Sequence, residues 1–202
     1  NSKKLAVLGT GALSMPLVMA HLSILDLSEI TIWGRSLDNA QAIADVLSNI
    51  GISANATSDL QQTLGNADIV AAATTATQPF IRSEWVKPGT HLSLMGAFTP
   101  NMAEAEPQLL PKTRLFVDSR EAVMQKGGEV LQALQKGLIV DADVRGELAD
   151  LLAISPKMPG RMTNQDITVF KSVGFAALDL FAAEHILQGL LQTSGSAFNS
   201  VD

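Results

Sequence analysis

The chain has 202 residues, of which 47% are hydrophobic and 17% are charged, and its formal net charge is −6. This composition is typical of a globular domain with a sizeable core and excludes a disordered chain. The acidic balance gives no basis for a nucleic-acid surface, and no apolar run reaches the roughly 20 residues of a membrane span, so we expect a cytoplasmic protein with neither kind of partner.

Short apolar segments predict the strands of a parallel sheet. They are apolar on both faces, as strands covered by helices are. A helix is expected from Ser14 onward, and apolar residues at helical spacing predict another over 37–50. This alternation predicts an α/β fold of the Rossmann-like, doubly wound kind with a mostly parallel sheet and flanking helices. The predicted strands are 5–9, 30–34, 67–73, 91–96 and 114–118.

The second part of the chain predicts shorter elements and one long helix. Segments 121–137 and 145–153 have the pattern of helices, 156–166 that of a loop, and 167–174 that of a further buried strand. A long helix follows, with apolar side chains nearly all round, so it needs partners on more than one side. We expect a nucleotide-binding domain over 1–172, a C-terminal helix over 173–193 and a loose tail over 194–202.

Several catalytic classes are excluded by residues that the chain lacks. It has no cysteine, which excludes disulfides, thiolate zinc sites and cysteine nucleophiles, and no tyrosine, which excludes the proton donor of short-chain dehydrogenases. The three histidines, His21, His91 and His185, are scattered, and 141–150 lacks the spacing of a calcium loop, so no metal is expected. No GxSxG segment points to a nucleophilic serine.

The segment Gly9–Ser14 matches the dinucleotide-binding fingerprint, with serine in the third small position. Gly9 allows a tight turn, Gly11 lets the backbone approach a pyrophosphate, and Ser14 is small enough for close packing of helix on strand. The helix that follows offers unpaired N–H groups and a positive dipole end to phosphates. The alternative is a glycine turn in an α/β protein that binds nothing.

The second predicted strand ends in Gly34-Arg35-Ser36, where many dinucleotide-binding proteins place a carboxylate. A carboxylate there bonds the ribose hydroxyls and repels a 2′-phosphate. A guanidinium suits phosphate oxygens, and Ser36 adds a hydroxyl and a backbone N–H. We therefore expect NADP(H) to be preferred, with NAD(H) as the alternative. If Arg35 is only a solvated charge after a strand, this preference does not follow.

Several motifs together resemble the ornithine cyclodeaminase and mu-crystallin family. They run in order across residues 4–190: "VLGTGA", "WGRS", "ADIVAAATTATQPF", "WVKPGTHLSLMGA", "VDSREA" and "DITVFKSVGFAALDLFAA". The resemblance implies a Rossmann domain within a longer homodimeric chain, whose first segment forms the substrate and dimer domain and receives the closing helix. That segment, which in the family carries the substrate-binding arginine and lysine, is not matched here, so we expect this piece alone to be inactive.

The resemblance also implies which residues bind the cofactor. They divide into a phosphate turn, an adenosine and ribose region, a strand end near the nicotinamide, and a segment that holds the carboxamide. In that order they are Gly9, Thr10, Gly11, Ala12 and Leu13; Arg35, Ser36, Ala73, Thr74 and Thr75; Met95, Gly96 and Ala97; and Ser172, Val173 and Gly174.

One departure from the family bears on the reaction. Members that cyclise ornithine carry an aspartate where this chain has Phe98, and a phenyl ring cannot transfer protons. Glu104 and Glu106 follow, but nearness in sequence does not make either a replacement. The resemblance then favours reduction of a small, cyclic α-imino acid to an amino acid. Ornithine cyclodeamination, an alanine-dehydrogenase-like activity and a non-catalytic NADP(H)-binding module are the alternatives.

Overall fold

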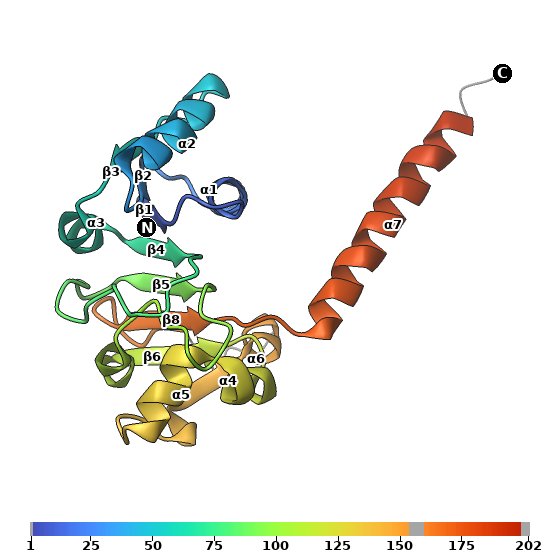
Figure 1. The fold of residues 1–202 in the computed structure, drawn as a ribbon. Coiled ribbons are helices and arrows are strands. Elements are labelled where there is room, and N and C mark those ends of the chain that lie inside the picture. Colours follow the sequence, from blue (N-terminus) through green and yellow to red (C-terminus); the bar gives the residue numbers. More distant parts are fainter. Residues whose placement is uncertain (1, 154–159, 199–202) are drawn as a thin grey trace.

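The computed structural model describes residues 2–153 and 160–198, which form one eight-stranded sheet with all neighbouring strands parallel (Figure 1). The strand order is β3-β2-β1-β4-β5-β8-β6-β7. The direction of winding reverses between β1 and β4, and ligands of open α/β sheets bind at such a reversal, beyond the carboxyl ends of the strands. The strands are β1 (Lys4–Leu8), β2 (Glu29–Trp33), β3 (Asn55–Thr57), β4 (Ile69–Ala72), β5 (His91–Leu94), β6 (Thr113–Val117), β7 (Val144–Glu147) and β8 (Ile167–Lys171).

Alternate side chains of the strands point to opposite faces of the sheet, and each face has its own core. Leu5 and Val7 pack with Val18 of α1 and Leu47 of α2, whereas Leu8 packs on the other face with residues of α3, α4 and α5. The sheet is therefore wound on both faces around β1. The helices are α1 (Ser14–Leu22), α2 (Leu37–Asn49), α3 (Leu60–Asn66), α4 (Arg120–Lys126), α5 (Gly128–Gln135), α6 (Leu148–Leu152) and α7 (Ala176–Phe198), with 3-10 turns η1 (Pro107–Lys112) and η2 (Asp141–Asp143).

The structure confirms the predicted fold class and each strand expected from apolar runs, but it corrects two segments. The helix predicted over 145–153 is wrong at its start, because Val144–Glu147 forms β7 on the edge of the sheet, and only Leu148–Leu152 is helical. The segment 121–137 forms two helices rather than one, with the break at Gly127. β3 has three residues, which is too short for its periodicity to be seen in the sequence.

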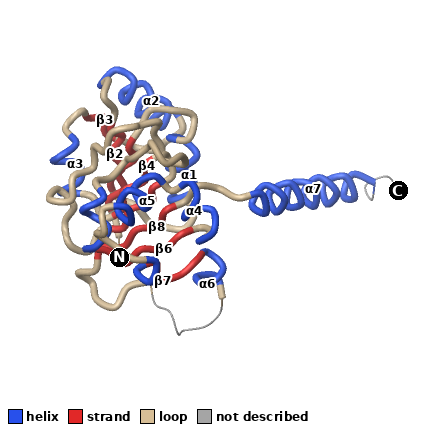
Figure 2. Tube along the Cα trace, turned by 60° about the horizontal axis from the view of Figure 1, so that its bottom comes forward, coloured by secondary structure: helices blue, strands red, loops and turns tan. Residues whose placement is uncertain are grey.

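Helix α7 extends away from the rest of the molecule (Figures 1 and 2). It runs from Ala176 to Phe198 and is thus longer than the predicted helix, because once a helix has formed each added residue gains a hydrogen bond at little cost. Its apolar side chains are exposed, as expected for a helix that needs further partners: Leu180, Phe181, Ile186, Leu187, Leu190 and Leu191. Residues 154–159 of the loop region and 199–202 of the predicted tail lie outside the described residues.

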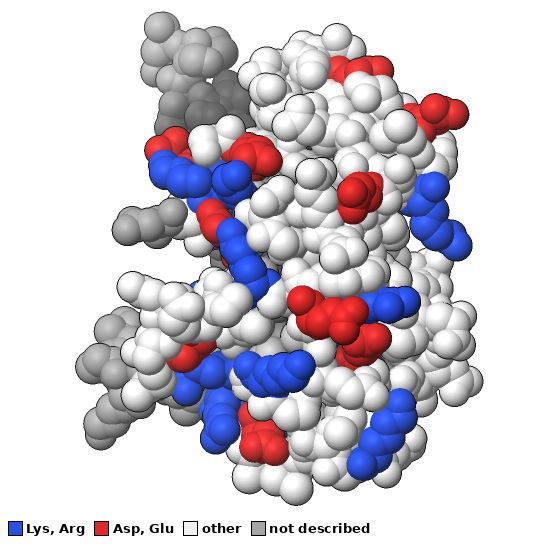
Figure 3. Space-filling view, turned by 90° about the vertical axis from the view of Figure 1, so that its left-hand side faces the viewer, with Lys and Arg blue, Asp and Glu red and all other residues white. Residues whose placement is uncertain are grey.

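The face of the sheet domain drawn in Figure 3 carries basic and acidic side chains interspersed, without a continuous region of one sign. Such mixing agrees with the modest net charge and differs from the one-sided basic surface typical of nucleic-acid-binding proteins. Within the part of the chain that the structure describes, no helix is both long and apolar enough to cross a membrane.

Candidate nucleotide-binding site

The turn after β1 has the conformation that a dinucleotide-binding turn requires. Gly9 has φ +122°, which side-chain-bearing residues rarely adopt, and a Cβ there would lie 3.1 Å from the carbonyl oxygen of Ala73. The Gly9 amide donates to the carbonyl of Trp33 (2.9 Å), which ties the turn to β2. Around the Cβ position of Gly11, by contrast, no atom lies within 4 Å. The backbone at Gly11 is therefore open to a ligand.

The N-terminus of α1 faces the same opening. Ser14 begins the helix, is buried, and donates its hydroxyl to the carbonyl of Gly9 (2.9 Å), so the third small residue of the fingerprint also closes the turn. No side chain caps α1. The Ser14 amide already donates to the Gly11 carbonyl (3.1 Å) and Pro16 has no N–H, so α1 offers an anion its dipole and the Met15 amide. Pro16 in the first turn costs nothing, because its missing N–H would have had no intrahelical partner.

The end of β2 explains why a glycine precedes Arg35. A Cβ on Gly34 would lie 2.6 Å from the methyl carbon of Thr10 and 3.0 Å from the carbonyl oxygen of Ser36, so the two turns approach closely only with glycine there. Arg35 is exposed and forms no ion pair with a carboxylate in the described part of the chain. The Ser36 oxygen accepts from the Asn39 amide (3.3 Å) as the N-cap of α2, and its hydroxyl hydrogen can still be donated.

These segments enclose a cavity of about 940 Å³ at the carboxyl ends of β1, β2 and β4. Eight of the residues expected to bind cofactor line it: Gly9, Thr10, Gly11, Arg35, Ser36, Ala73, Thr74 and Thr75. Trp33 and Phe80 also line it, with their rings stacked at 5.3 Å and 12°. The cavity thus combines glycine turns, a helix N-terminus, a cation and an aromatic wall, and these groups fit the phosphates, ribose and base of a dinucleotide.

The other expected cofactor residues lie along the same edge but do not line this cavity. Ala12 and Leu13 are exposed at the start of α1. Gly96 and Ala97 follow β5 and are buried, while Met95 beside them is half-buried, as is the turn 172–174 after β8. Because β5 pairs with both β4 and β8, these turns are neighbours of the cavity. The structure therefore places the two halves of the expected site side by side, on opposite sides of β4.

Neither glutamate after Phe98 replaces the missing aspartate. Glu104 is fully buried and its carboxylate accepts from the amides of Thr74 and Gly96, both at 2.7 Å. Glu106 accepts from the Ser83 amide (3.1 Å). Both carboxylates are engaged by the backbone, whereas Phe98 is 48% exposed at the end of β5. Acid–base work by a carboxylate at this point has no support in the geometry.

His91 is a structural histidine. It begins β5, and its Nδ1 lies 2.8 Å from the hydroxyl of Thr168 on β8. Burial, with smaller contributions from Arg161 and His21, lowers the pKa of His91 to about 4, so its ring is neutral at physiological pH. Within residues 2–153 and 160–198, no group of three or more side chains that could ligate a metal ion comes together.

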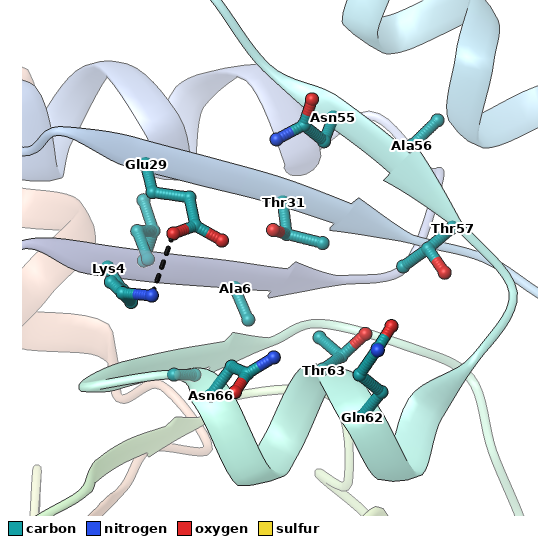
Figure 4. Close-up of a pocket in the computed structure, with 12 residues that line it drawn as sticks. Lys4, Ala6, Glu29, Thr31, Asn55, Ala56, Thr57, Gln62, Thr63 and Asn66 are labelled. Atoms are coloured by element: carbon teal, nitrogen blue, oxygen red, sulfur yellow. Dashed lines mark ion pairs between the residues drawn. The ribbon is translucent and has the colours of Figure 1, made fainter.

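A smaller hollow of about 280 Å³ lies between α3 and the starts of β1 and β2, and its wall is lined mainly by polar side chains (Figure 4). An ion pair between Lys4 and Glu29 (2.9 Å) lies at one end of it. It lies toward the amino ends of β1 and β2, whereas ligands of parallel sheets bind at the carboxyl ends. We therefore assign the larger cavity, and not this hollow, to the nucleotide.

Sequence reasoning missed several residues that shape the site. Trp33 was treated only as part of a predicted strand and a family motif, and Phe80 only as part of a motif, because their stacking brings together residues far apart in the chain. Asp118 was placed only in the predicted strand 114–118 and in a family motif, although its carboxylate accepts from the hydroxyl of Ser172 (2.8 Å) and the amides of Val173 (2.9 Å) and Gly174 (2.7 Å). A carboxylate directly after a buried strand was the available signal.

Comparison with known proteins shows that the chain is similar to part of two reductases. It is 39% identical over 187 residues to Delta(1)-pyrroline-2-carboxylate reductase of Paracoccus denitrificans, covering 92% of this chain and 58% of that protein. It is 32% identical over 183 residues to mouse ketimine reductase mu-crystallin, covering 91% and 54%. The chain thus spans little more than half the length of these relatives.

Solved structures agree with this placement. Thermococcus litoralis Delta(1)-pyrroline-2-carboxylate reductase, solved with NADH and L-proline, superposes with a TM-score of 0.89 at 26% identity, covering 96% of this chain and 59% of that one. An archaeal alanine dehydrogenase dimer with bound NAD superposes with a TM-score of 0.87 at 26% identity, over 96% and 59%. The family model described as ornithine cyclodeaminase/mu-crystallin matches residues 1–194. The chain therefore belongs to the ornithine cyclodeaminase/mu-crystallin family.

Proposed function

We propose that this chain is the nucleotide-binding part of an NADP(H)-dependent oxidoreductase that reduces a small α-imino acid to an amino acid. The observation that carries the proposal is the cavity at the ends of β1, β2 and β4, with its open glycine turn and uncapped helix. Relatives named as pyrroline-2-carboxylate and ketimine reductases support the reaction class.

The preference for NADP(H) depends on Arg35. It lies on the rim of the cavity beside Ser36, in the part of the chain that in Rossmann folds meets the adenosine ribose, and no carboxylate pairs with it in the described residues. A 2′-phosphate there would gain a charge-assisted hydrogen bond. The structures of relatives contain NADH or NAD, so NAD(H) is the alternative for this chain.

The experiment that tests this preference is a calorimetric titration of NADPH and NADH against the wild type and Arg35→Ala. Loss of the charge-assisted contact should weaken NADPH binding by about 1.5–3 kcal/mol and leave NADH binding nearly unchanged. Asp38→Ala, which removes a nearby charge of the opposite sign on α2, is the matched control and should not weaken NADPH. Equal affinities for both cofactors in the wild type would contradict the preference.

Phe98 favours imine reduction over ornithine cyclisation as the reaction. Cyclisation with loss of ammonia needs a group that takes a proton from the attacking amine and gives one to the leaving amino group. A protonated imine already accepts hydride at carbon, so the enzyme has mainly to hold that carbon close to the cofactor. The bound cofactor would supply the hydride. NADPH oxidation by the full-length protein with pyrroline-2-carboxylate should exceed proline formation from ornithine with NAD. Proline formation from ornithine that is faster than NADPH oxidation with pyrroline-2-carboxylate would contradict this assignment.

The substrate and dimer contacts belong, in this proposal, to the part of the protein that precedes the matched segment in its relatives. The exposed apolar side chains of α7 would then pack on that part, in a homodimer. This division predicts that the 202-residue chain binds cofactor but reduces little imine by itself. A cytoplasmic location stays a prediction of the composition.

A further inference from the structure

We propose that two buried carboxylates, Glu104 and Asp118, are positioning residues that hold the two turns receiving the nicotinamide end of the cofactor, after β5 and β8, and join the first of them to the turn after β4. The inference rests on the proposed function, because only a nicotinamide nucleotide gives these turns a ligand. The turns follow β4, β5 and β8, which are adjacent in the sheet. Neither carboxylate is on the strands that it connects, so the arrangement is a product of the tertiary structure.

Glu104 joins the first two turns. Its Oε1 accepts from the Thr74 amide after β4, and its Oε2 accepts from the Gly96 amide after β5, both at 2.7 Å. The carboxylate also explains the glycine, because a Cβ at position 96 would lie 2.3 Å from Oε1 of Glu104 and 2.1 Å from the Thr74 carbonyl oxygen. The turns thus meet around one carboxylate, and Thr74 is the point where this half of the edge joins the adenosine cavity.

Asp118 holds the third turn. Its Oδ2 accepts from the Ser172 hydroxyl and from the amides of Val173 and Gly174, while its Oδ1 accepts from the Ser119 amide (2.8 Å). Gly174 has φ +74°, a conformation that glycine adopts freely. Hydrogen bonds donated to a carboxylate are about twice as strong as those between neutral groups, so this turn is held in place before any ligand arrives.

Two further buried charged side chains, Lys171 and Glu129, lie close to these turns in the fold. Lys171 directly precedes Ser172, is fully buried and pairs with the buried Glu129 (3.2 Å). Burial raises the pKa of Glu104, while the amides of Gly96 and Thr74 and the charge of Lys171 oppose that rise. Buried charges cost stability unless they are paired or hydrogen-bonded. Their concentration under a cofactor edge, and not elsewhere in the described core, indicates a requirement for fixed turn geometry.

The test compares two ligands on the same protein: NADPH, and ADP-ribose 2′-phosphate, which is NADPH without the nicotinamide ring. Glu104→Gln turns a side-chain N–H toward a backbone N–H, and Asp118→Asn does the same at the third turn. Asp118→Asn should weaken NADPH by about tenfold or more while changing ADP-ribose 2′-phosphate by less than about threefold. Glu104→Gln also releases the Thr74 amide beside the adenosine cavity, so it should weaken both ligands, and NADPH more than ADP-ribose 2′-phosphate. Glu106→Gln, which alters a carboxylate bonded to the Ser83 amide and to neither cofactor turn among the described residues, should leave both affinities unchanged.

A second measurement needs no variant. In the ligand-free wild type, the amide hydrogens of Thr74, Gly96, Val173 and Gly174 should exchange slowly with solvent, because each is already bonded to a carboxylate. Rapid exchange at these amides, or variants that weaken both ligands equally or neither, would overturn the positioning role while leaving the cofactor site intact. If the wild type binds neither ligand, the proposed function fails and this inference fails with it.

Discussion

In the proposed cofactor site, the adenosine half is shaped by turns close in sequence, whereas the nicotinamide half is held by carboxylates that come from elsewhere in the fold. Around β1 and β2 the turns depend on glycines and a helix N-terminus within Gly9–Ser14 and at Gly34. Around β5 and β8 they depend on Glu104 and Asp118. The first kind of site can be recognised from a short motif, while the second requires the folded chain.

This difference predicts that the largest loss of stability comes from removing a buried charge beside the turns after β5 and β8. Lys171→Met leaves Glu129 buried without its counter-ion and should lower the free energy of unfolding by about 3–5 kcal/mol. Urea unfolding measures this. Lys171→Met combined with Glu129→Met removes both charges and should recover most of the loss. A double variant as unstable as the sum of the singles would show that the pair is not coupled.

Adding one methyl group at Gly96, in the second half, should lower the free energy of unfolding almost as much as removing the buried charge. Gly96→Ala places a Cβ 2.1 Å from the Thr74 carbonyl oxygen and 2.3 Å from Glu104, so backbone has to move. The expected loss of stability is about 3 kcal/mol, the upper end for overpacking in a core. Thermal or urea unfolding gives the value. A stability equal to that of the wild type would contradict the close approach of the two turns.

The strand β5, which leads to the second half, should also give the protein a pH-dependent stability through His91 at its amino end. The pKa of His91 is lowered to about 4, so when the pH falls below about 6.5 the unfolded chain takes up the proton first. Stability from this group is complete above pH 6.5 and is lost toward pH 4, by about 2–3 kcal/mol. Urea unfolding between pH 7.5 and 4.5 should show a weaker loss in His91→Gln. The pKa of Glu104 is raised, so protonation of this group stabilises the folded chain as the pH falls. This contribution is the same in the wild type and in His91→Gln and cancels when the two are compared.

The smallest effect on stability is expected in the first half. Gly11→Ala adds a Cβ with no atom within 4 Å, so unfolding free energy should change by less than about 0.5 kcal/mol. The same Cβ lies where the backbone approaches a pyrophosphate, and nucleotide affinity should fall by about tenfold. Calorimetry and urea unfolding on one preparation check both values. A stable variant with unchanged affinity would place the phosphates elsewhere.

Much of the fold was predictable because strands buried on both faces appear in the sequence as short runs of apolar residues. The strands at 5–9, 30–34 and 67–73 are short apolar runs, and the structure confirms them as β1, β2 and β4. β7 was missed because Val144–Glu147 pairs with one neighbour at the sheet edge and continues directly into α6. Edge strands need fewer apolar residues, so their composition does not distinguish them from helix.

The sequence by itself determined the strand–turn–helix unit at Gly9–Ser14, the cation that follows β2 and the absence of a carboxylate at Phe98, since each depends on residue types within a few positions. Only the tertiary structure decided that Glu104 and Asp118 are engaged by backbone amides and that Trp33 stacks on Phe80. The physical reason is distance along the chain. A hydrogen bond between residues 30 or 55 positions apart forms only after the sheet has brought the strand ends together.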